Sequence, residues 1–171
     1  MTENNSAPRL LADIGGTNAR FALFNGAQPY CETTLACADY PSLAAAIEHY
    51  LANIDHLRPR QAVIAVATAV DRDHIKLTNH VWSFSISETR RQLDFDVLKV
   101  INDFSALALS LPHLSSTQLH QVGAGKSESE TPIALIGPGT GLGVSGLIPS
   151  DTGWIPLQSE GGPVSYTHLT L

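Results

Sequence analysis

The sequence is poor in charge, in cysteine and in long apolar runs, and each shortage excludes a class of protein. Only 15% of the 171 residues are charged, and ten Lys and Arg against sixteen Asp and Glu leave a formal charge of −6. Such a chain has no basic field to hold a phosphate backbone, so nucleic acid is not an expected partner. No apolar run approaches the roughly 20 residues that cross a bilayer, and the first residues lack the apolar core of a signal peptide. We therefore expect no membrane contact and a cytoplasmic location.

Cysteine and histidine are too few and too scattered to build a covalent framework or a metal centre. Cys31 and Cys37 stand without a second cysteine pair, and the seven histidines include no His-x-x-x-His pair that would share a helix face. Stability must then come from an ordinary apolar core, which the 43% apolar content allows.

Apolar runs alternate with turn signals in an order typical of an α/β protein. Apolar residues repeated every four positions predict a helix over 42–53. Ser85 and Glu88 have the Ser-x-x-Glu pattern of a capping box and predict a second, short helix. A third helix is expected over 104–111, where Pro112 stops it. The predicted strands are 10–14, 19–24, 32–36, 61–70, 97–101, 133–136 and 144–148.

A glycine-rich turn joins the first two predicted strands. Gly15 and Gly16 let backbone N–H groups approach an anion closely, and Thr17 and Asn18 add side-chain donors. Asp13 ends an otherwise apolar strand, where a carboxylate needs solvent, a donor or a cation. The segment is either a phosphate loop with a hydrated Mg²⁺ at Asp13, or an ordinary tight hairpin whose turn Asp13 caps.

A second glycine-rich segment holds four glycines from Gly137 to Gly143. Its Gly-x-Gly-x-Gly spacing matches a dinucleotide fingerprint only superficially, because a strand and not a helix is predicted to follow. It is not a Walker sequence either, since no Gly-Lys-Ser or Gly-Lys-Thr ends it. Two glycine-rich hairpins, each with a Thr after Gly, suggest two phosphate loops that face one cleft.

Polar residues interrupt the apolar pattern at a predicted strand-to-helix junction. Asp103 is suited to act as a general base toward a hydroxyl, with Asn102 orienting the same substrate. Asp is also a preferred helix N-cap, so capping is the alternative, and the two roles are compatible.

Glu160 suits polyol hydroxyls as an acceptor, although most loop glutamates are only solvated. Trp82 is expected in the core or in a cleft wall.

Five segments, in their order and spacing, closely resemble the bacterial glucokinase family. The resemblance implies a member of the hexokinase and actin-like ATPase superfamily, whose members close two α/β domains over nucleotide and substrate. The implied fold is a ribonuclease H-like α/β domain with a mixed five-stranded sheet, followed by the first strands of an incomplete second domain. The segments are 11–20 (LADIGGTNAR), 77–84 (LTNHVWSF), 101–104 (INDF), 137–144 (GPGTGLGV) and 160–162 (EGG).

The same resemblance implies ATP and Mg²⁺ as cofactors, glucose as substrate, and homodimers for full-length members. Asp103 matches the base that accepts the proton of the glucose 6-hydroxyl, and Asp13 matches the residue that holds Mg²⁺ through water. The implied glucose contacts are Asn102, Asp103 and Glu160. The implied phosphate-binding residues are Asp13, Gly15, Gly16, Thr17, Asn18, Gly137, Gly139, Thr140 and Gly141.

The sequence departs from the family near its C-terminus. Pro163 stands where the family continues Glu-Gly-Gly with a glucose-contacting His, and the following residues no longer resemble it. The chain also has about half of the family's length. We therefore expect a truncated, inactive N-terminal fragment of a glucokinase. Its expected parts are a disordered start at 1–8, a small ribonuclease H-like domain at 9–112, the start of a larger domain at 113–162 and a non-family tail at 163–171.

Two other functions stay open. A kinase for another hexose or an amino sugar would keep both phosphate loops and the Asn102–Asp103 pair. The other is a non-catalytic actin-like or chaperone-type ATPase half, without kinase activity, which sugar-independent ATP hydrolysis would favour and the same pair counts against. Turnover with several sugars and without sugar distinguishes these functions.

Overall fold

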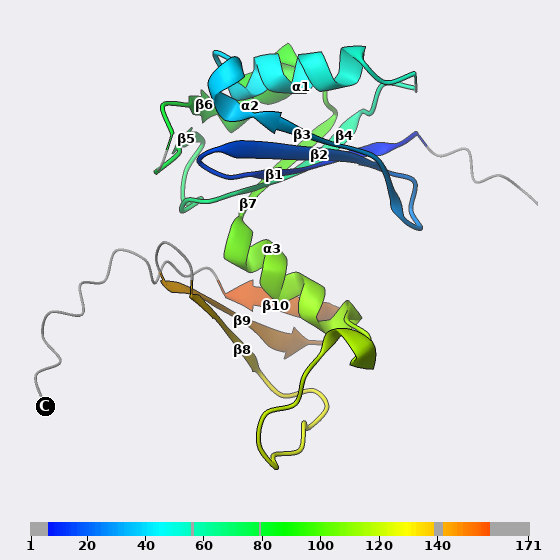
Figure 1. Cartoon of the computed structure of the whole chain (residues 1–171), viewed down its shortest axis with the longest axis vertical. Helices are drawn as coiled ribbons and strands as arrows, with labels where there is room; N and C mark the ends of the chain where they lie inside the picture. The colour runs from blue at the N-terminus through cyan, green and yellow to red at the C-terminus, as the bar shows by residue number, and fades with distance from the viewer. Residues whose placement is uncertain (1–6, 56, 79, 139–141, 158–171) are drawn as a thin grey trace, which may run out of the picture. The chain divides into compact units, whose positions relative to one another are not determined.

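A computed structural model describes residues 7–55, 57–78, 80–138 and 142–157, with the elements coloured along the chain in Figure 1. The contacts within the chain divide it into two compact units, Met1–Asp103 and Phe104–Leu171. The first unit ends at Asp103, the first residue of helix α3, whereas the expected domain boundary follows residue 112. The domain limits remain a prediction.

The first unit is built on a five-stranded sheet with strand order β3-β2-β1-β4-β7. The β1–β2 and β2–β3 pairs are antiparallel, and the β1–β4 and β4–β7 pairs are parallel. The sheet is therefore mixed, as predicted. Its strands are β1 (Arg9–Ile14), β2 (Asn18–Phe24), β3 (Pro29–Ala36), β4 (Gln61–Val66) and β7 (Val97–Asn102).

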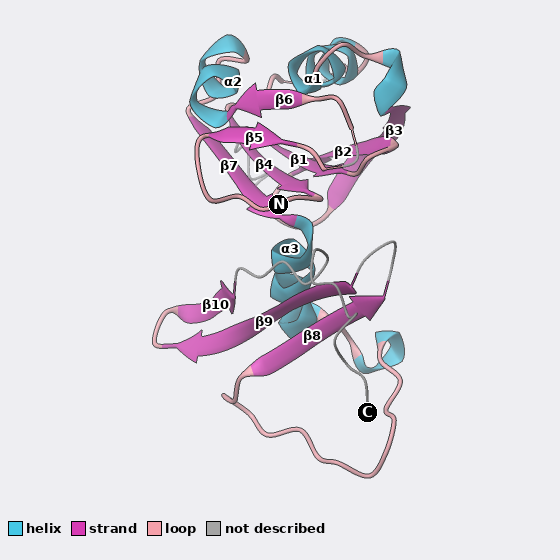
Figure 2. Cartoon of the chain, turned by 90° about the vertical axis from the view of Figure 1, so that its left-hand side faces the viewer, coloured by secondary structure: helices cyan, strands magenta, loops and turns pink. Residues whose placement is uncertain are grey.

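Helices α1 (Leu43–Ala52) and α2 (Ile86–Gln92) lie over one face of this sheet (Figure 2). Both begin at a serine cap. The Ser42 hydroxyl accepts a hydrogen bond from the backbone N–H of Ala45 at 3.2 Å, and that of Ser85 accepts one from the N–H of Glu88 at 3.1 Å. The predicted start of α2 is thus confirmed. Helices on this face carry the chain between parallel strands, which a tight hairpin cannot do.

The core lies between that sheet face and the helices. The rings of Phe21 and Tyr50 stack with centroids 5.2 Å apart, and the Tyr50 hydroxyl donates to the Cys31 carbonyl at 2.9 Å. Trp82, expected in the core or a cleft wall, is buried, and its ring N–H donates to the Tyr40 carbonyl at 2.9 Å. The largest fully buried side chains of this unit are Tyr50, Phe21, Leu10, Ile14, Leu23, Leu43, Ile47, Ile64, Ile75, Leu93 and Val66.

Strand β4 is shorter than predicted. It ends at Val66 instead of residue 70, because its neighbours β1 and β7 end level with it, at Ile14 and Asn102. A hairpin of β5 (His74–Lys76) and β6 (Ser83–Ser85), which was not predicted, follows before α2. Strands of three residues are too short to show an alternating pattern.

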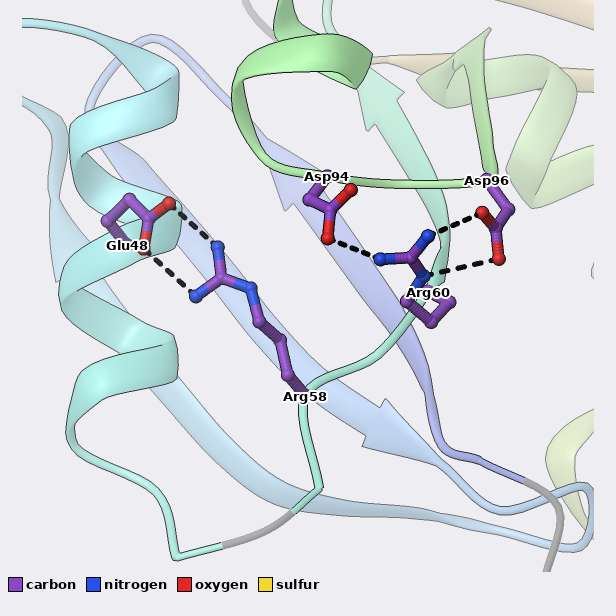
Figure 3. A network of polar contacts seen from close by, with 5 residues as sticks. All are labelled: Glu48, Arg58, Arg60, Asp94 and Asp96. Atoms are coloured by element: carbon purple, nitrogen blue, oxygen red, sulfur yellow. Dashed lines mark hydrogen bonds and ion pairs between the residues drawn. The ribbon is translucent and has the colours of Figure 1, made fainter.

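Exposed arginines tie the beginning of β4 to its neighbours (Figure 3). The Arg58 guanidinium bonds both carboxylate oxygens of Glu48 on α1, at 2.7 and 3.2 Å. The Arg60 guanidinium bonds Asp94, and it bonds Asp96, just before β7, at 2.7 and 3.2 Å. This contact holds the pKa of the Asp96 carboxyl below its usual range. Exposed pairs of this kind each contribute little to stability, so their role is to hold the loops that precede β4 and β7.

The second unit contains a three-stranded antiparallel sheet in the order β10-β9-β8. Strands β8 and β9 pair as the predicted hairpin, and β10 was not predicted. No helix among the described residues is long and apolar enough to span a bilayer. The elements from Asp103 on are α3 (Asp103–Ser110), the 3-10 turns η2 (Leu111–His113) and η3 (Ser116–Gln118), and strands β8 (Ile133–Pro138), β9 (Leu142–Ser150) and β10 (Gly153–Leu157).

The buried hydroxyl of Tyr50 predicts a pH-dependent stability. Burial, with smaller effects of Cys31 and Tyr30, raises the pKa of Tyr50 from 10.0 to about 12. Its contribution to folding is then complete below about pH 10 and is lost as the pH rises toward 12, because the unfolded side chain ionises first. The Tyr50→Phe variant keeps the ring but loses the hydrogen bond, and we expect it to be about 1 kcal/mol less stable at neutral pH.

Urea unfolding at about pH 8 and about pH 11 checks this expectation. The difference in unfolding free energy between wild type and Tyr50→Phe should shrink at the higher pH, because other titrating groups cancel in the comparison. An equal difference at both pH values would contradict it.

Candidate functional site

The carboxyl ends of three parallel strands meet at one edge of the five-stranded sheet. Ile14, Val66 and Asn102, the last residues of β1, β4 and β7, lie in register across the strands. Neighbouring strands are about 4.8 Å apart, so the chain leaves β1 and β7 roughly 10 Å from each other. This edge brings together the first glycine-rich turn, which starts at Gly15, and the junction at Asp103.

The first glycine-rich turn is supported from behind by Cys37, which is fully buried. The backbone N–H of Cys37 donates to the Thr17 carbonyl at 2.8 Å, and its thiol lies 3.6 Å from the Gly15 carbonyl. Within the turn, the N–H of Gly15 donates to the Asn18 carbonyl at 3.0 Å. The residues Thr17 and Asn18 are exposed, so both side chains can reach a ligand.

Asp13 pairs with Arg20 across β1 and β2. The two residues are opposite each other in the register, and Arg20 Nη1 lies 2.9 Å from Asp13 Oδ2. Both side chains are more than half exposed, at 51% for Asp13 and 64% for Arg20. The pair lines a hollow of about 470 Å³ on the sheet face away from the helices. An exposed carboxylate with one oxygen in an ion pair is compatible with a hydrated Mg²⁺ at the other.

The described residues contain no group of three or more His, Cys, Asp and Glu side chains placed to hold a metal ion. The prediction of a single carboxylate that contacts the metal through water requires no such group.

Asn102 is buried at the end of β7, at 7% exposure, and is tied to the loop after β4. Its side-chain amide donates to the Thr68 carbonyl at 3.2 Å. The Thr68 hydroxyl lies 3.3 Å from the Lys76 carbonyl and 3.1 Å from the Thr78 hydroxyl. The amide is thus held by a network that reaches the β5–β6 hairpin. Asp103, half-buried, is the first residue of α3, where the helix dipole favours an acidic side chain.

The second glycine-rich segment forms the end of the β8–β9 hairpin. Gly137 pairs with Gly143 and Pro138 with Leu142, so these four residues are in strands and not in a loop as predicted. The connecting residues Gly139, Thr140 and Gly141, and the predicted sugar contact Glu160, lie outside the described residues, as do residues 163–171.

Two contributors to the site were not predicted. Cys37 was considered only for disulfide or zinc chemistry, and its role behind the turn rests on contacts 20 or more residues away in sequence. Thr68 contacts Asn102 through a backbone carbonyl, which leaves no signal in a sequence. Only Thr78, inside the segment 77–84, lay in a recognised motif.

The chain belongs to the glucokinase family, whose model matches residues 10–170. It is 54% identical over 160 residues to the bifunctional protein glk of Burkholderia lata, covering 93% of this chain and 25% of that protein. It is 47% identical over 173 residues to the glucokinase of Cupriavidus pinatubonensis, covering 98% of this chain and 50% of that protein. The chain thus spans half or less of these relatives.

A solved structure agrees with the assignment to the glucokinase family. The crystal structure of glucokinase from an Antarctic psychrotroph matches with a TM-score of 0.82 and 40% identity, covering 97% of this chain and 54% of that one. The predicted α/β fold class is confirmed. The family match includes most of 163–171, the segment expected to depart from the family, and so gives that departure no support.

The support from Cys37 predicts that the two cysteines react differently. Burial raises the pKa of the Cys37 thiol, whereas Cys31 is half-buried. Because the thiolate is the reactive form, iodoacetamide at about pH 8 should modify Cys31 well before Cys37 in the folded chain. Peptide mass spectrometry follows each site, and both should react alike in urea. Equal rates in the folded chain would show that the turn does not cover Cys37.

Proposed function

We propose that this chain carries the glucose-binding and base-bearing part of an ATP-dependent glucokinase, which converts glucose to glucose 6-phosphate. The observation that supports this most is the shared sheet edge in a chain of the glucokinase family. There the glycine-rich turn after β1 and the Asn102–Asp103 junction after β7 lie at the same edge of the sheet, on either side of β4. The first is suited to phosphate, the second to a sugar hydroxyl.

In this mechanism Asp103 accepts the proton of the glucose 6-hydroxyl as its oxygen attacks the γ-phosphorus of ATP. The bond from that phosphorus to the bridging oxygen breaks, and ADP leaves. Asn102 orients the sugar, because its buried side-chain amide is held by the Thr68 carbonyl. A positioned base of this kind contributes typically 10²- to 10⁴-fold to the rate.

The first turn is proposed to bind phosphate oxygens through the exposed Thr17 and Asn18 side chains. Asp13 is proposed to contact Mg²⁺ through water, since oxygen donors and retained waters are what this ion prefers. When bound to ATP, Mg²⁺ neutralises charge on the phosphates. The same role in phosphate binding is proposed for Gly137 and for the residues Gly139, Thr140 and Gly141. Glu160 is proposed as a further glucose contact.

The base is tested in a completed protein, which joins residues 1–162 of this chain to the second half of the Cupriavidus pinatubonensis glucokinase. We expect Asp103→Asn to lower kcat for glucose phosphorylation by about 10²- to 10⁴-fold while the unfolding midpoint stays close to that of the parent. The amide keeps the shape of the carboxylate but cannot accept the proton. A coupled assay of glucose 6-phosphate measures the loss.

The matched control is Asp55→Asn, because Asp55 is an exposed aspartate outside the proposed site. The 171-residue chain alone sets the background, which we expect to be zero. Other hexoses, amino sugars and a sample without sugar test the competing activities. Near-normal turnover in Asp103→Asn would refute the assignment of the base, and sugar-independent hydrolysis would favour the ATPase alternative.

The role of Asp13 is tested by breaking its ion pair from each side. We expect Asp13→Asn in the completed protein to raise the Mg²⁺ concentration needed for half-maximal rate by roughly 10- to 100-fold. Arg20→Gln removes the same ion pair but keeps the carboxylate, so its Mg²⁺ requirement should stay close to that of the parent. Similar shifts in the two variants would show that the ion pair matters and not the metal contact.

A further inference from the structure

The Thr68 side chain connects the loop after β4 to the β5–β6 hairpin. Its hydroxyl donates to the Lys76 carbonyl at 3.3 Å and lies 3.1 Å from the Thr78 hydroxyl. A hydroxyl carries one proton and a carbonyl can only accept, so the Thr78 hydroxyl is the donor in the second contact. The side chain of Thr68 is therefore bonded to two residues, eight and ten positions further along the chain.

The hairpin that holds the Thr68 hydroxyl is anchored in the core of the first unit. Ile75, Leu77 and Trp82 are at most 3% exposed. The backbone N–H of Leu77, next to Thr78, donates to the Trp82 carbonyl at 3.1 Å and continues the pairing of β5 with β6 (Figure 2). The hairpin is thus a fixed support for the Thr68 side chain.

The backbone carbonyl of Thr68 holds the Asn102 amide. Strand β4 ends at Val66, and the N–H of Ala67 bonds the Ile14 carbonyl at 3.2 Å. Thr68 follows, outside any strand, so no ladder of strand hydrogen bonds sets the direction of its carbonyl. That carbonyl accepts from Asn102 Nδ2 at 3.2 Å. The bonds of the Thr68 hydroxyl to the hairpin supply the support that the strand no longer gives.

We propose that Thr68 is a positioning residue, whose hydroxyl bonds to the β5–β6 hairpin hold its carbonyl in place and so orient the Asn102 amide for a sugar hydroxyl. The proposal rests on the proposed function for the sugar, but the link from the hairpin to the amide stands without it. An amide held in one orientation binds a ligand without a further cost of ordering. Loss of the Thr68 hydroxyl should therefore weaken the binding of sugar and not that of nucleotide.

The link is tested in the 171-residue chain by a double-mutant cycle. Thr68→Val keeps the shape of the side chain but removes the hydroxyl, and we expect it to lower the thermal unfolding midpoint by on the order of 3 °C. Thr78→Val should cost less alone and nothing further in the Thr68→Val background, because the bond between the two hydroxyls is already lost there. Equal costs of Thr78→Val in both backgrounds would overturn the link.

Exchange of the Asn102 side-chain amide protons, followed by NMR, reports on the amide itself. We expect this exchange to be roughly fivefold faster in Thr68→Val and unchanged in Thr68→Ser, which keeps the hydroxyl. Thr131→Val is the matched control, because it removes a hydroxyl bond to the Glu128 carbonyl at 3.0 Å that is outside this network. Exchange no faster in Thr68→Val than in Thr131→Val would overturn the link.

The sugar part of the proposal is tested in the completed protein. We expect Thr68→Val to raise the KM for glucose by about fivefold to tenfold, with the KM for ATP within about twofold of the parent value. Thr68→Ser should restore the KM for glucose. A rise of the same size in both KM values would overturn the positioning role, because a general loosening of the fold has no preference for the sugar.

A second cycle shows whether Thr68 acts through Asn102. Once Asn102→Ala has removed the amide, Thr68→Val should raise the KM for glucose no further, and additive effects would overturn the positioning role. A normal KM for glucose in Asn102→Ala would instead refute the sugar contact of the proposed function, and the sugar part of this proposal with it. The amide exchange in the 171-residue chain decides the link in either case.

Discussion

The parallel pairing of β1, β4 and β7 is the constraint on which the rest of the first unit depends. Parallel neighbours end at the same edge, so three segments far apart in sequence release their next residues at one place. The glycine-rich turn, Thr68 and Asp103 all follow from that register. A slip of one residue in β7 would move Asn102 to the opposite face and break its bond to the Thr68 carbonyl.

Glycine in this chain serves two different physical needs. Gly15 belongs to a tight turn that hydrogen-bonds within itself and leaves neighbouring side chains exposed to a ligand. Gly137 and Gly143 stand in paired strands, where the missing side chains make room for the ring of Phe104. A glycine-rich motif therefore combines residues that face a ligand with residues that face the core, and only the spatial arrangement separates them.

Much of the fold could be predicted from the sequence, because the pattern is local. The strands of the mixed sheet, the serine cap of α2 and the β8–β9 hairpin each depend on residues close in sequence. β4 ends early, level with the last residues of β1 and β7, which are far from it in sequence, and no local pattern shows that. β10, which was not predicted, contains Pro156 and lies at the sheet edge, where proline is tolerated.

The residues of the proposed site also differ in whether a local sequence pattern or only a contact in the folded chain reveals them. Asp13, Asn102 and Asp103 stand at strand ends where a polar side chain interrupts an apolar run, and this interruption is visible in the sequence. The residues that pack against the glycine-rich segments are not visible in that way. Cys37 and Phe104 are ordinary apolar residues by pattern, and their contacts with the glycines arise only from the folded chain.

The bond between Asn102 and Thr68 has a consequence for which substitutions at position 68 preserve it. Every amino acid carries a backbone carbonyl, so the partner of the Asn102 amide survives any substitution at position 68 that keeps the path of the chain. The Thr68 hydroxyl, by contrast, is lost with most substitutions, and with it the link to Thr78. Orientation of the amide thus depends on the shape of the backbone, whereas its connection to the β5–β6 hairpin depends on the side chains at positions 68 and 78.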